Sequence, residues 1–258
     1  MISKSIGFIG GGRITRILLE GWHRAGKLPG RIVVSDCNVE AVAKLKARFG
    51  SIETTDDNST AAGQGIVFLA VHPPVMAEVC AGVKGALKPD AVVVSLAPKF
   101  TVAKLSDLLG GFDRIARVIP NAPSVIGQGY NPVSFGAVLG PADRAAVKAL
   151  LEPLGKCPEV AEEKLEAYAV LTAMGPTYLW FQLQALRDVA AGLGLSDAEI
   201  TPAWERMVCG SVHTLLKSGL SPAEVMDVIP VKPLAEMEVQ VTELYRTRLP
   251  AVYQKIRP

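Results

Sequence analysis

The chain has 258 residues, 49% of them hydrophobic and 20% charged, and its formal net charge is +2. This near-neutral balance, without a basic cluster, predicts that the chain does not bind nucleic acid or another polyanion. The length is enough for one large or two modest domains. The four cysteines show neither CxxC nor another metal-ligand spacing, so we expect free thiols of a reducing compartment and no metal site.

The apolar stretches of the chain are short. Runs such as Ile66–Val71 and Ala91–Leu96 fall far below the roughly 20 residues that span a bilayer. The first residues lack the long apolar run and small-residue cleavage site of a signal peptide. We therefore expect a cytoplasmic protein with no membrane partner.

The first half of the chain alternates short apolar runs with segments of helical spacing. Buried strands that alternate with helices form βαβ units around a parallel sheet, so we predict an α/β fold with a doubly wound parallel sheet. The expected strands are Ile6–Ile9, Arg31–Ser35, Ile66–Val71, Ala91–Leu96 and Arg114–Val118, and the expected helices are Thr15–Ala25, Val39–Phe49, Val75–Leu87, Val102–Leu109 and Pro141–Leu151.

The pattern changes after residue 156, where strand-like runs become rare. Gly194, Gly219 and Pro230 break this half into segments of helical spacing, so we predict a first domain over residues 1–155 and an all-helical domain over residues 156–258. The apolar segment Tyr178–Leu193 should lie in a core or in a subunit interface. The expected helices are Lys164–Ala173, Pro176–Leu193, Ala198–Ser218 and Pro233–Lys255.

Glycines crowd between the first expected strand and the first expected helix. Gly10 and Gly12 occupy the first two positions of the pattern G-x-G-x-x-G, and Thr15 stands at the third. The first glycine allows a tight turn, the second lets a pyrophosphate approach the backbone, and the helix N-terminus then faces the anion. The loop predicts a Rossmann domain that binds a dinucleotide, with a ligand-free glycine turn as the alternative. The residues expected to hold the nucleotide are Gly10, Gly11, Gly12, Arg13 and Ile14.

An acid follows the second expected strand. Asp36 stands at about the separation from the glycine loop that suits a carboxylate accepting from the ribose hydroxyls of the adenosine. Its charge would repel a 2′-phosphate, so the sequence favours NAD over NADP. The alternative is that Asp36 only caps the next helix. Arg13 could still reach a phosphate, which leaves the cofactor preference open.

Motifs along nearly the whole chain are similar to those of one enzyme family. Ile6–Gly12 matches its opening, and Ala70-Val71-His72-Pro73 stands where the family has Ala-Val-Lys-Pro. Arg117–Pro123 resembles its Arg-x-Met-Pro-Asn-Thr-Pro, with the expected glycines following, and Gly175-Pro176-Thr177-Tyr178 resembles its Gly-Pro-Ala-Tyr. The chain thus resembles pyrroline-5-carboxylate reductase, the last enzyme of proline biosynthesis.

The resemblance implies an N-terminal Rossmann domain and a helical C-terminal dimerisation domain. The active site would lie between the two, with helical parts supplied by the partner of a homodimer or larger homo-oligomer. By the same resemblance Asn121 lies near the nicotinamide, and Gly175 and Pro176 belong to the substrate wall. The residues that would line the cofactor cleft are Ala70, Val71, His72 and Pro73.

The departures from the family collect at its substrate site. Thr172-Ala173-Met174 replaces Ser-Gly-Ser, Ala97-Pro98-Lys99 replaces Ala-Ala-Gly, and a helical Glu becomes Gln184. The loop that holds the substrate carboxylate in the family, Thr-Ser-Pro-Gly-Gly-Thr-Thr, becomes Pro230–Glu236. Losing several donors to a buried carboxylate costs roughly a few kcal/mol of binding, so we expect a changed substrate.

Five side chains are candidates for work on the substrate. His72 follows a strand at the sheet edge where ligands bind. Thr172 and Tyr178 lie in the segment that resembles the family's substrate wall. The alternative for each of the three residues is a purely structural role. Lys99 and Lys232 enter loops where the family has neutral residues. They would offer point charges to an anionic group, or they belong to the solvated surface.

These observations predict an NAD(P)H-dependent oxidoreductase, using NADH by preference, that reduces a small cyclic imine or a related C=N or C=O substrate by hydride transfer. A protonated imine is already electrophilic, so the protein mainly positions the reactants. The alternatives are a true pyrroline-5-carboxylate reductase and a dinucleotide-binding paralogue without catalysis. A hydroxy-acid dehydrogenase is disfavoured because no helical Lys stands in a catalytic context.

Overall fold

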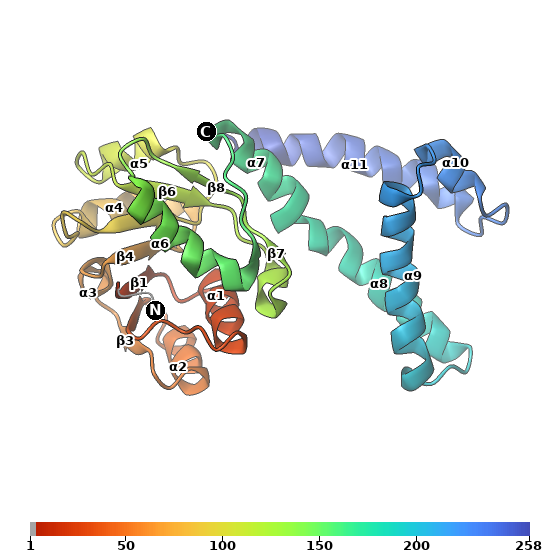
Figure 1. The fold of residues 1–258 in the computed structure, drawn as a ribbon, viewed down its shortest axis with the longest axis horizontal. Coiled ribbons are helices and arrows are strands. Elements are labelled where there is room, and N and C mark those ends of the chain that lie inside the picture. The colour runs from red at the N-terminus through yellow and green to blue at the C-terminus, as the bar shows by residue number, and fades with distance from the viewer. Residues whose placement is uncertain (1–3) are drawn as a thin grey trace. The chain divides into compact units, whose positions relative to one another are not determined.

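The chain folds into two compact units, which the computed structural model describes over residues 4–258. The sheet unit runs to Met174 and includes Val252–Pro258, and the helical unit is Gly175–Ala251. Figure 1 labels most of the helices and strands of both. No helix among the described residues is long and apolar enough to cross a membrane.

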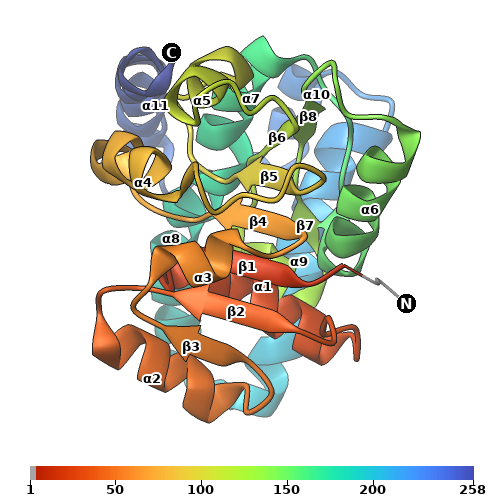
Figure 2. The ribbon, with the colours of Figure 1, turned by 90° about the vertical axis from the view of Figure 1, so that its left-hand side faces the viewer.

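A seven-stranded sheet forms the centre of the sheet unit, in the order β3-β2-β1-β4-β5-β6-β8 (Figure 2). Neighbouring strands from β3 to β6 pair in parallel, and β8 is antiparallel to β6. A second, two-stranded sheet pairs β7 with β9. The strands are β1 Ile6–Ile9, β2 Ile32–Ser35, β3 Glu53–Thr55, β4 Ile66–Leu69, β5 Val92–Ser95, β6 Ile115–Val118, β7 Gly129–Tyr130, β8 Val133–Phe135 and β9 Gly155–Lys156.

Helices cover both faces of the large sheet, because alternate residues of its buried strands point to opposite sides. Ile6 and Phe8 of β1 join one hydrophobic core with residues of α1, α2 and α6, whereas Ile9 joins the other with residues of α3, α4 and α5. The doubly wound Rossmann arrangement is therefore confirmed. The helices are α1 Arg13–Arg24, α2 Val39–Arg48, α3 Asn58–Ala62, α4 Met76–Val83, α5 Val102–Leu108 and α6 Pro141–Leu151.

The predicted strands and helices of this unit all form, with shorter ends in most cases. The sequence did not indicate β3, α3 or β8. The strand Glu53–Thr55 has no apolar run, and Val133–Phe135 is only three residues long, so neither gives the pattern of a buried strand. The short helix α3 packs so close to β1 that a Cβ on Gly7 would lie 1.9 Å from the carbonyl oxygen of Ala61.

The segment predicted as one helix over Lys164–Ala173 changes its winding along its length. The short helix α7, Leu165–Tyr168, runs directly into a π-helical turn at Ala169–Ala173. Leu165 and Ala169 form a small third core with Ile119, and Ile256 near the end of the chain packs against it. π-Helical turns are rare and occur often at functional sites.

Four helices make up most of the helical unit, and the breaks predicted at Gly194 and Gly219 are confirmed by left-handed backbone at both glycines. Ser196 and Ser221 start two of the helices, each in a capping box with a glutamate three residues on. The helices are α8 Gly175–Gly192, α9 Asp197–Lys217, α10 Pro222–Asp227 and α11 Ala235–Ile256, the last ending in the sheet unit.

The helical unit buries almost none of its apolar side chains. No residue of α8, α10 or α11 is buried, and α9 buries only Ile200. The side chains of Leu179, Trp180 and Phe181 on α8 are 52%, 54% and 67% exposed. Of the two places expected for Tyr178–Leu193, a core is excluded within the described chain, because α8 buries no residue, and a subunit interface stays a prediction.

Candidate functional site

The glycine loop connects β1 to α1 and is held closed by hydrogen bonds. Gly10 has a φ of 107°, a left-handed conformation that favours glycine, and a Cβ there would lie 2.6 Å from the carbonyl oxygen of Ala70. The Gly10 carbonyl accepts a hydrogen bond of 2.5 Å from the buried hydroxyl of Thr15. Thr15, at the third position of the glycine pattern, therefore ties the start of the loop to α1.

The second glycine of the pattern leaves open space at the helix N-terminus. Gly12 is the N-cap of α1, and no atom beyond its chain neighbours lies within 4 Å of the position of a Cβ. The first N–H groups of a helix have no partner within the helix, and the helix dipole favours negative charge there. Gly12 thus gives an anion access to backbone donors that a side chain would cover.

Asp36 lies beside this loop, at the carboxyl end of β2. Its Oδ2 accepts a hydrogen bond of 2.7 Å from the amide of Gly11, and its Oδ1 accepts one of 2.8 Å from the amide of Asn38. The cap of α2 is the side chain of Asn38, which accepts from Ala41. The carboxylate of Asp36 is therefore oriented by two backbone amides at the place where a ribose is bound in this fold.

A cleft of about 310 Å³ opens between the glycine loop and the carboxyl ends of the neighbouring strands. It brings together Gly12 of the loop, Arg13 and Ile14 at the start of α1, and the turn that follows β4. His72 is exposed at this turn and makes no capping hydrogen bond to it. The predicted residues that line the cleft are Gly12, Arg13, Ile14, Ala70, Val71, His72 and Pro73.

The rest of the cleft wall comes from residues that the sequence did not single out for this role. They follow β5 or β6, stand in the segment that leads up to Gly175, or, in the case of Ile17, lie on α1. The signals for them were the carboxyl ends of two more parallel strands and the family segments that contain several of these residues, which were assigned no contact with the nucleotide. These residues are Ile17, Leu96, Ala97, Pro98, Ile119, Pro120, Ala169, Ala173 and Met174.

Asn121 and Thr172 hold segments together beside this wall. The side-chain oxygen of Asn121 accepts from the amide of Tyr130 at 3.0 Å, and its amide group donates to the carbonyl oxygen of Thr172 at 3.2 Å. The hydroxyl of Thr172 donates to the carbonyl oxygen of Tyr168 at 2.8 Å. These bonds explain why both polar side chains tolerate partial or full burial.

The remaining predicted residues do not line this cleft. Lys99 has an exposed side chain in the turn after β5, and its φ is 79°. Gly175, Pro176, Tyr178 and Lys232 belong to the helical unit. The ring of Tyr178 lies 6.0 Å from the ring of Tyr245, and burial raises the pKa of its hydroxyl.

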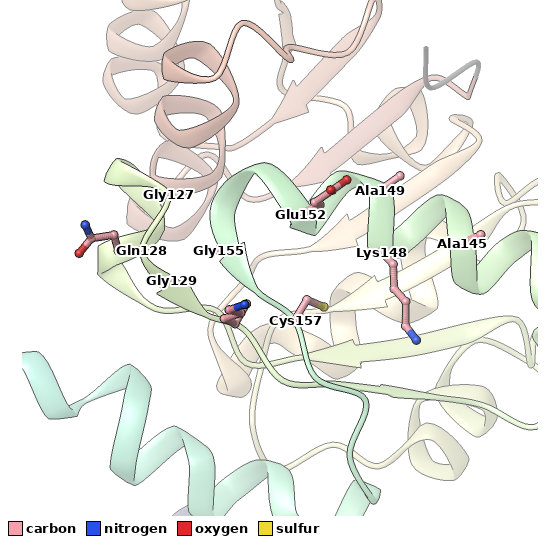
Figure 3. Close-up of a pocket in the computed structure, with 10 residues that line it drawn as sticks. Gly127, Gln128, Gly129, Ala145, Lys148, Ala149, Glu152, Gly155 and Cys157 are labelled. Carbon is pink, nitrogen blue, oxygen red and sulfur yellow. The ribbon is translucent and has the colours of Figure 1, made fainter. Parts of the chain in front are cut away.

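A larger cavity of about 930 Å³ lies elsewhere on the sheet unit (Figure 3). Lys148 and Glu152 of the α6 region border it together with the half-buried thiol of Cys157. Burial raises the pKa of that thiol to about 11, so it is a poor nucleophile near neutral pH. None of the predicted site residues borders this cavity. Among residues 4–258 no cluster of three or more His, Cys, Asp or Glu side chains could hold a metal ion.

The parallel sheet, the glycine loop at the start of α1 and the cleft beyond it define the class of the protein, a dinucleotide-binding oxidoreductase with a Rossmann domain. A family model described as NADP oxidoreductase, coenzyme F420-dependent, matches residues 5–99. The pyrroline-5-carboxylate reductase of Corynebacterium melassecola is 30% identical over 223 residues, which are 85% of this chain and 83% of the relative. The chain belongs to the pyrroline-5-carboxylate reductase family, and it is an NAD(P)-dependent reductase.

Solved structures of the same family share the fold over nearly the whole chain. A pyrroline-5-carboxylate reductase from Coxiella burnetii is 27% identical, with a TM-score of 0.70 and coverage of 98% of this chain and 94% of that one. The Plasmodium falciparum pyrroline carboxylate reductase with NADP bound is 20% identical, with a TM-score of 0.79 and coverage of 100% and 98%. The arrangement of strands and helices is therefore that of the family.

Proposed function

We propose that the chain reduces a small cyclic imine, with a reduced nicotinamide nucleotide held in the cleft beside the glycine loop. The observation that carries the proposal is the open N-terminus of α1 at Gly12, which borders a cleft lined by the loop, the turn at His72 and the ends of β5 and β6. A reduced nicotinamide bound there supplies the hydride for a C=N bond. The carbon receives the hydride, and a nitrogen that is already protonated keeps its proton and becomes an amine.

The residues of the chain bind and orient the reactants in this proposal. The backbone amides around Gly12 and Arg13 hold the pyrophosphate, and the carboxylate of Asp36 accepts from the ribose. Apolar residues such as Ala97 and Ile119 exclude water from the cleft wall. A cationic imine needs little acid catalysis. The cleft fits this requirement, because His72 and Arg13 are the only titratable residues among those that line it.

We propose further that NADH is the preferred nucleotide. The carboxylate of Asp36 is fixed by two amides, so it cannot swing away from a 2′-phosphate without losing both bonds. Titrating the pure protein with NADH and with NADPH, followed by nucleotide fluorescence, tests this preference. We expect NADH to bind at least tenfold more tightly, about 1.4 kcal/mol. Equal affinities would contradict the preference but leave the reductase proposal standing.

The substrate proposal concerns the carboxylate of the family's substrate. Pro230–Glu236 offers no hydroxyl group, and its two prolines have no N–H donor. Assays with NADH should compare pyrroline-5-carboxylate with 1-pyrroline, the same ring without the carboxylate. We expect kcat/KM for the two to lie within tenfold of each other, whereas a strong preference for the acid supports a true pyrroline-5-carboxylate reductase. Nucleotide binding without turnover of either ring supports a paralogue without catalysis.

Lys99 and Lys232 remain candidates for contact with an anionic substrate group. Both side chains are exposed, and Lys232 stands in the altered loop itself. If their charges replace the lost donors, the variant K99A/K232A should raise KM for pyrroline-5-carboxylate and leave KM for 1-pyrroline unchanged. An unchanged KM for the acid would place both lysines among ordinary surface residues.

We also propose that two copies of the chain associate through the helical unit. The exposed apolar side chains of α8 exceed what a solvated helix usually carries, and large exposed apolar patches mark interfaces. Phe181 is 67% exposed and Val189 is 58% exposed on this helix. The variant F181E should shift the protein to monomers in sedimentation experiments, and a control such as Q184E should not. A wild-type monomer would contradict the proposal.

A further inference from the structure

One buried carboxylate connects three segments of the sheet unit. Glu166 of α7 is 1% exposed, and its Oε1 accepts a hydrogen bond of 3.1 Å from the amide of Lys99. The same oxygen accepts from Nη2 of Arg117, a β6 residue that is also 1% exposed. Nη1 of Arg117 donates to Glu162 at 3.0 Å, and Glu162 accepts from the amide of Val102 at 2.7 Å.

Each of the three segments leads into the wall of the cleft. Ala97 and Pro98 stand immediately before Lys99, Ile119 and Pro120 follow Arg117 on the chain, and the π-helical turn Ala169–Ala173 follows Glu166. A displacement of any one of them changes the space that the cleft offers to the nucleotide. Glu166 itself does not line the cleft, so it acts through the residues that do.

The segment at Lys99 needs such a tether more than the others. Among the described residues, Lys99 is the only one other than glycine with a positive φ, at 79°. Pro98 followed by a left-handed residue corresponds to the two central positions of a type II turn, where glycine is favoured at the second. A lysine with a Cβ holds this conformation only when its surroundings stabilise it.

We propose that Glu166 is a positioning residue for the nucleotide cleft, and that its carboxylate keeps the Pro98–Lys99 turn in the left-handed geometry that shapes the wall. This inference rests on the proposed function, because it assigns the cleft to the nucleotide. Arg117 neutralises the buried carboxylate and fixes it at the same time, since a buried charge needs both a partner and hydrogen bonds. Glu162 holds Arg117 from the other side.

The test uses the variant E166D, which keeps the charge but shortens the side chain by one methylene, so the carboxylate no longer reaches the amide of Lys99. We expect the Kd for NADH to rise about tenfold, measured by fluorescence titration. A glycine at position 99 adopts the turn without strain. The double variant E166D/K99G should therefore bind NADH within about threefold of K99G alone, whereas E166D/K99A should stay about tenfold weaker than K99A.

The pair K99G and K99A separates a backbone effect from the loss of the lysine charge, because both variants remove it. E163Q is the matched control, since Glu163 is exposed and lies in the same segment. If circular dichroism shows that E166D does not fold, K99P takes its place. Proline at position 99 has no N–H to donate to Glu166 and cannot adopt a φ of 79°, whereas the buried ion pair between Glu166 and Arg117 stays intact. We expect its Kd to rise at least tenfold.

Three outcomes would overturn the inference. The first is a folded E166D, or K99P in its place, that binds NADH as tightly as the wild-type protein. The second is rescue of E166D by K99A to the same extent as by K99G. The third is a wild-type protein that binds neither NADH nor NADPH, which would also overturn the proposed function, whereas the first two leave that function intact.

Discussion

The amide of Gly11 donates a hydrogen bond of 2.7 Å to Oδ2 of Asp36, so the glycine loop and the end of β2 are joined before any nucleotide is bound. Each carboxylate oxygen has more than one lone pair, and an oxygen that accepts from one amide can still accept from a ribose hydroxyl. The bond therefore fixes the direction of the carboxylate and still leaves it able to accept a hydrogen bond from the ribose.

Replacing Asp36 should change the affinity for NADH and the choice between the nucleotides. In D36A both the ribose acceptor and the negative charge are lost, and we expect the Kd for NADH to rise about tenfold or more, roughly 1–3 kcal/mol. The Kd for NADPH should fall relative to that for NADH, because the repulsion of a 2′-phosphate is removed. Titrations of both nucleotides check this, with D107N as the control for an exposed carboxylate on α5. An unchanged ratio of the two Kd values would contradict the role given to Asp36.

Alanine should affect mainly nucleotide binding at one outer glycine of the loop and mainly folding stability at the other. In G12A the new methyl group meets no protein atom within 4 Å, and alanine is only a poorer N-cap than glycine. We expect an unfolding free energy within about 1 kcal/mol of the wild type but a Kd for NADH at least roughly tenfold higher. In G10A the methyl group meets the Ala70 carbonyl and the backbone is strained, so stability itself should fall.

Urea unfolding and nucleotide titration of both variants check this pair. G82A serves as the control, because Gly82 lies in α4 with open space around it and alanine favours the helix. If G12A bound NADH normally, the pyrophosphate would have to lie elsewhere.

The four thiols should differ in their reactivity towards alkylating reagents. Cys37 and Cys209 are exposed, whereas burial raises the pKa of Cys80 and of Cys157 to about 11, which leaves very little thiolate at pH values around 8. Cys37 follows Asp36 in the chain, so bound NADH should slow its labelling at least severalfold and leave Cys209 unaffected. Mass spectrometry of peptides after timed labelling measures each rate. Equal protection of both exposed thiols would indicate a general change of the protein instead of a ribose at Asp36.

The pair of Glu20 on α1 and Arg48 on α2 should contribute to the loss of stability in acid. Hydrogen bonds of 3.1 Å from Arg48 lower the pKa of Glu20 below its ordinary value of 4.5. A carboxyl whose pKa is lowered by folding stabilises the folded state above its unfolded pKa, and this stabilisation is lost as the pH falls through the folded pKa.

In R48M we expect the pKa of Glu20 to rise, because the hydrogen bonds from Arg48, the largest cause of its lowering, are lost, while burial still raises it and Arg16 and His23 still lower it. Titration of the Glu20 carboxyl by NMR measures the shift directly, and urea unfolding at about pH 6 and pH 3.5 should show a weaker acid dependence than in the wild type. K27M, which removes an exposed charge from the same region, is the control. An unchanged Glu20 titration in R48M would show that the pair has no effect in solution.

The sequence predicted the parts of the fold that repeat a local pattern. Ile6–Ile9 is a buried strand at the predicted residues, because a short apolar run that ends at a glycine loop is typical of a buried strand. The antiparallel strand β8 was missed because Val133–Phe135 owes its pairing to β6 and not to its own composition. Likewise α8 has the apolar composition of a core helix, yet burial depends on what surrounds it.

The site was predictable to the extent that its residues follow a motif. Arg13 at the start of α1 and His72 in the turn after β4 both line the cleft. Ala169 reaches the same wall from far along the chain, through a π-helical turn that no spacing indicates. Glu166 and Arg117 are charged residues that composition alone places on a surface, and only the three-dimensional pairing of the two reveals why they are buried.

The hydrogen bond from Thr15 to the carbonyl of Gly10 bears on the kinetics of binding. A run of three glycines is among the most mobile sequences in an unfolded chain, and a segment that must become ordered around its ligand loses affinity and association rate in doing so. In this protein the glycine run loses its conformational freedom when the domain folds, because the side chain of Thr15 in the first turn of α1 forms a hydrogen bond with it. The nucleotide meets a rigid receptor, and its on-rate should be limited by encounter and not by rearrangement of the loop.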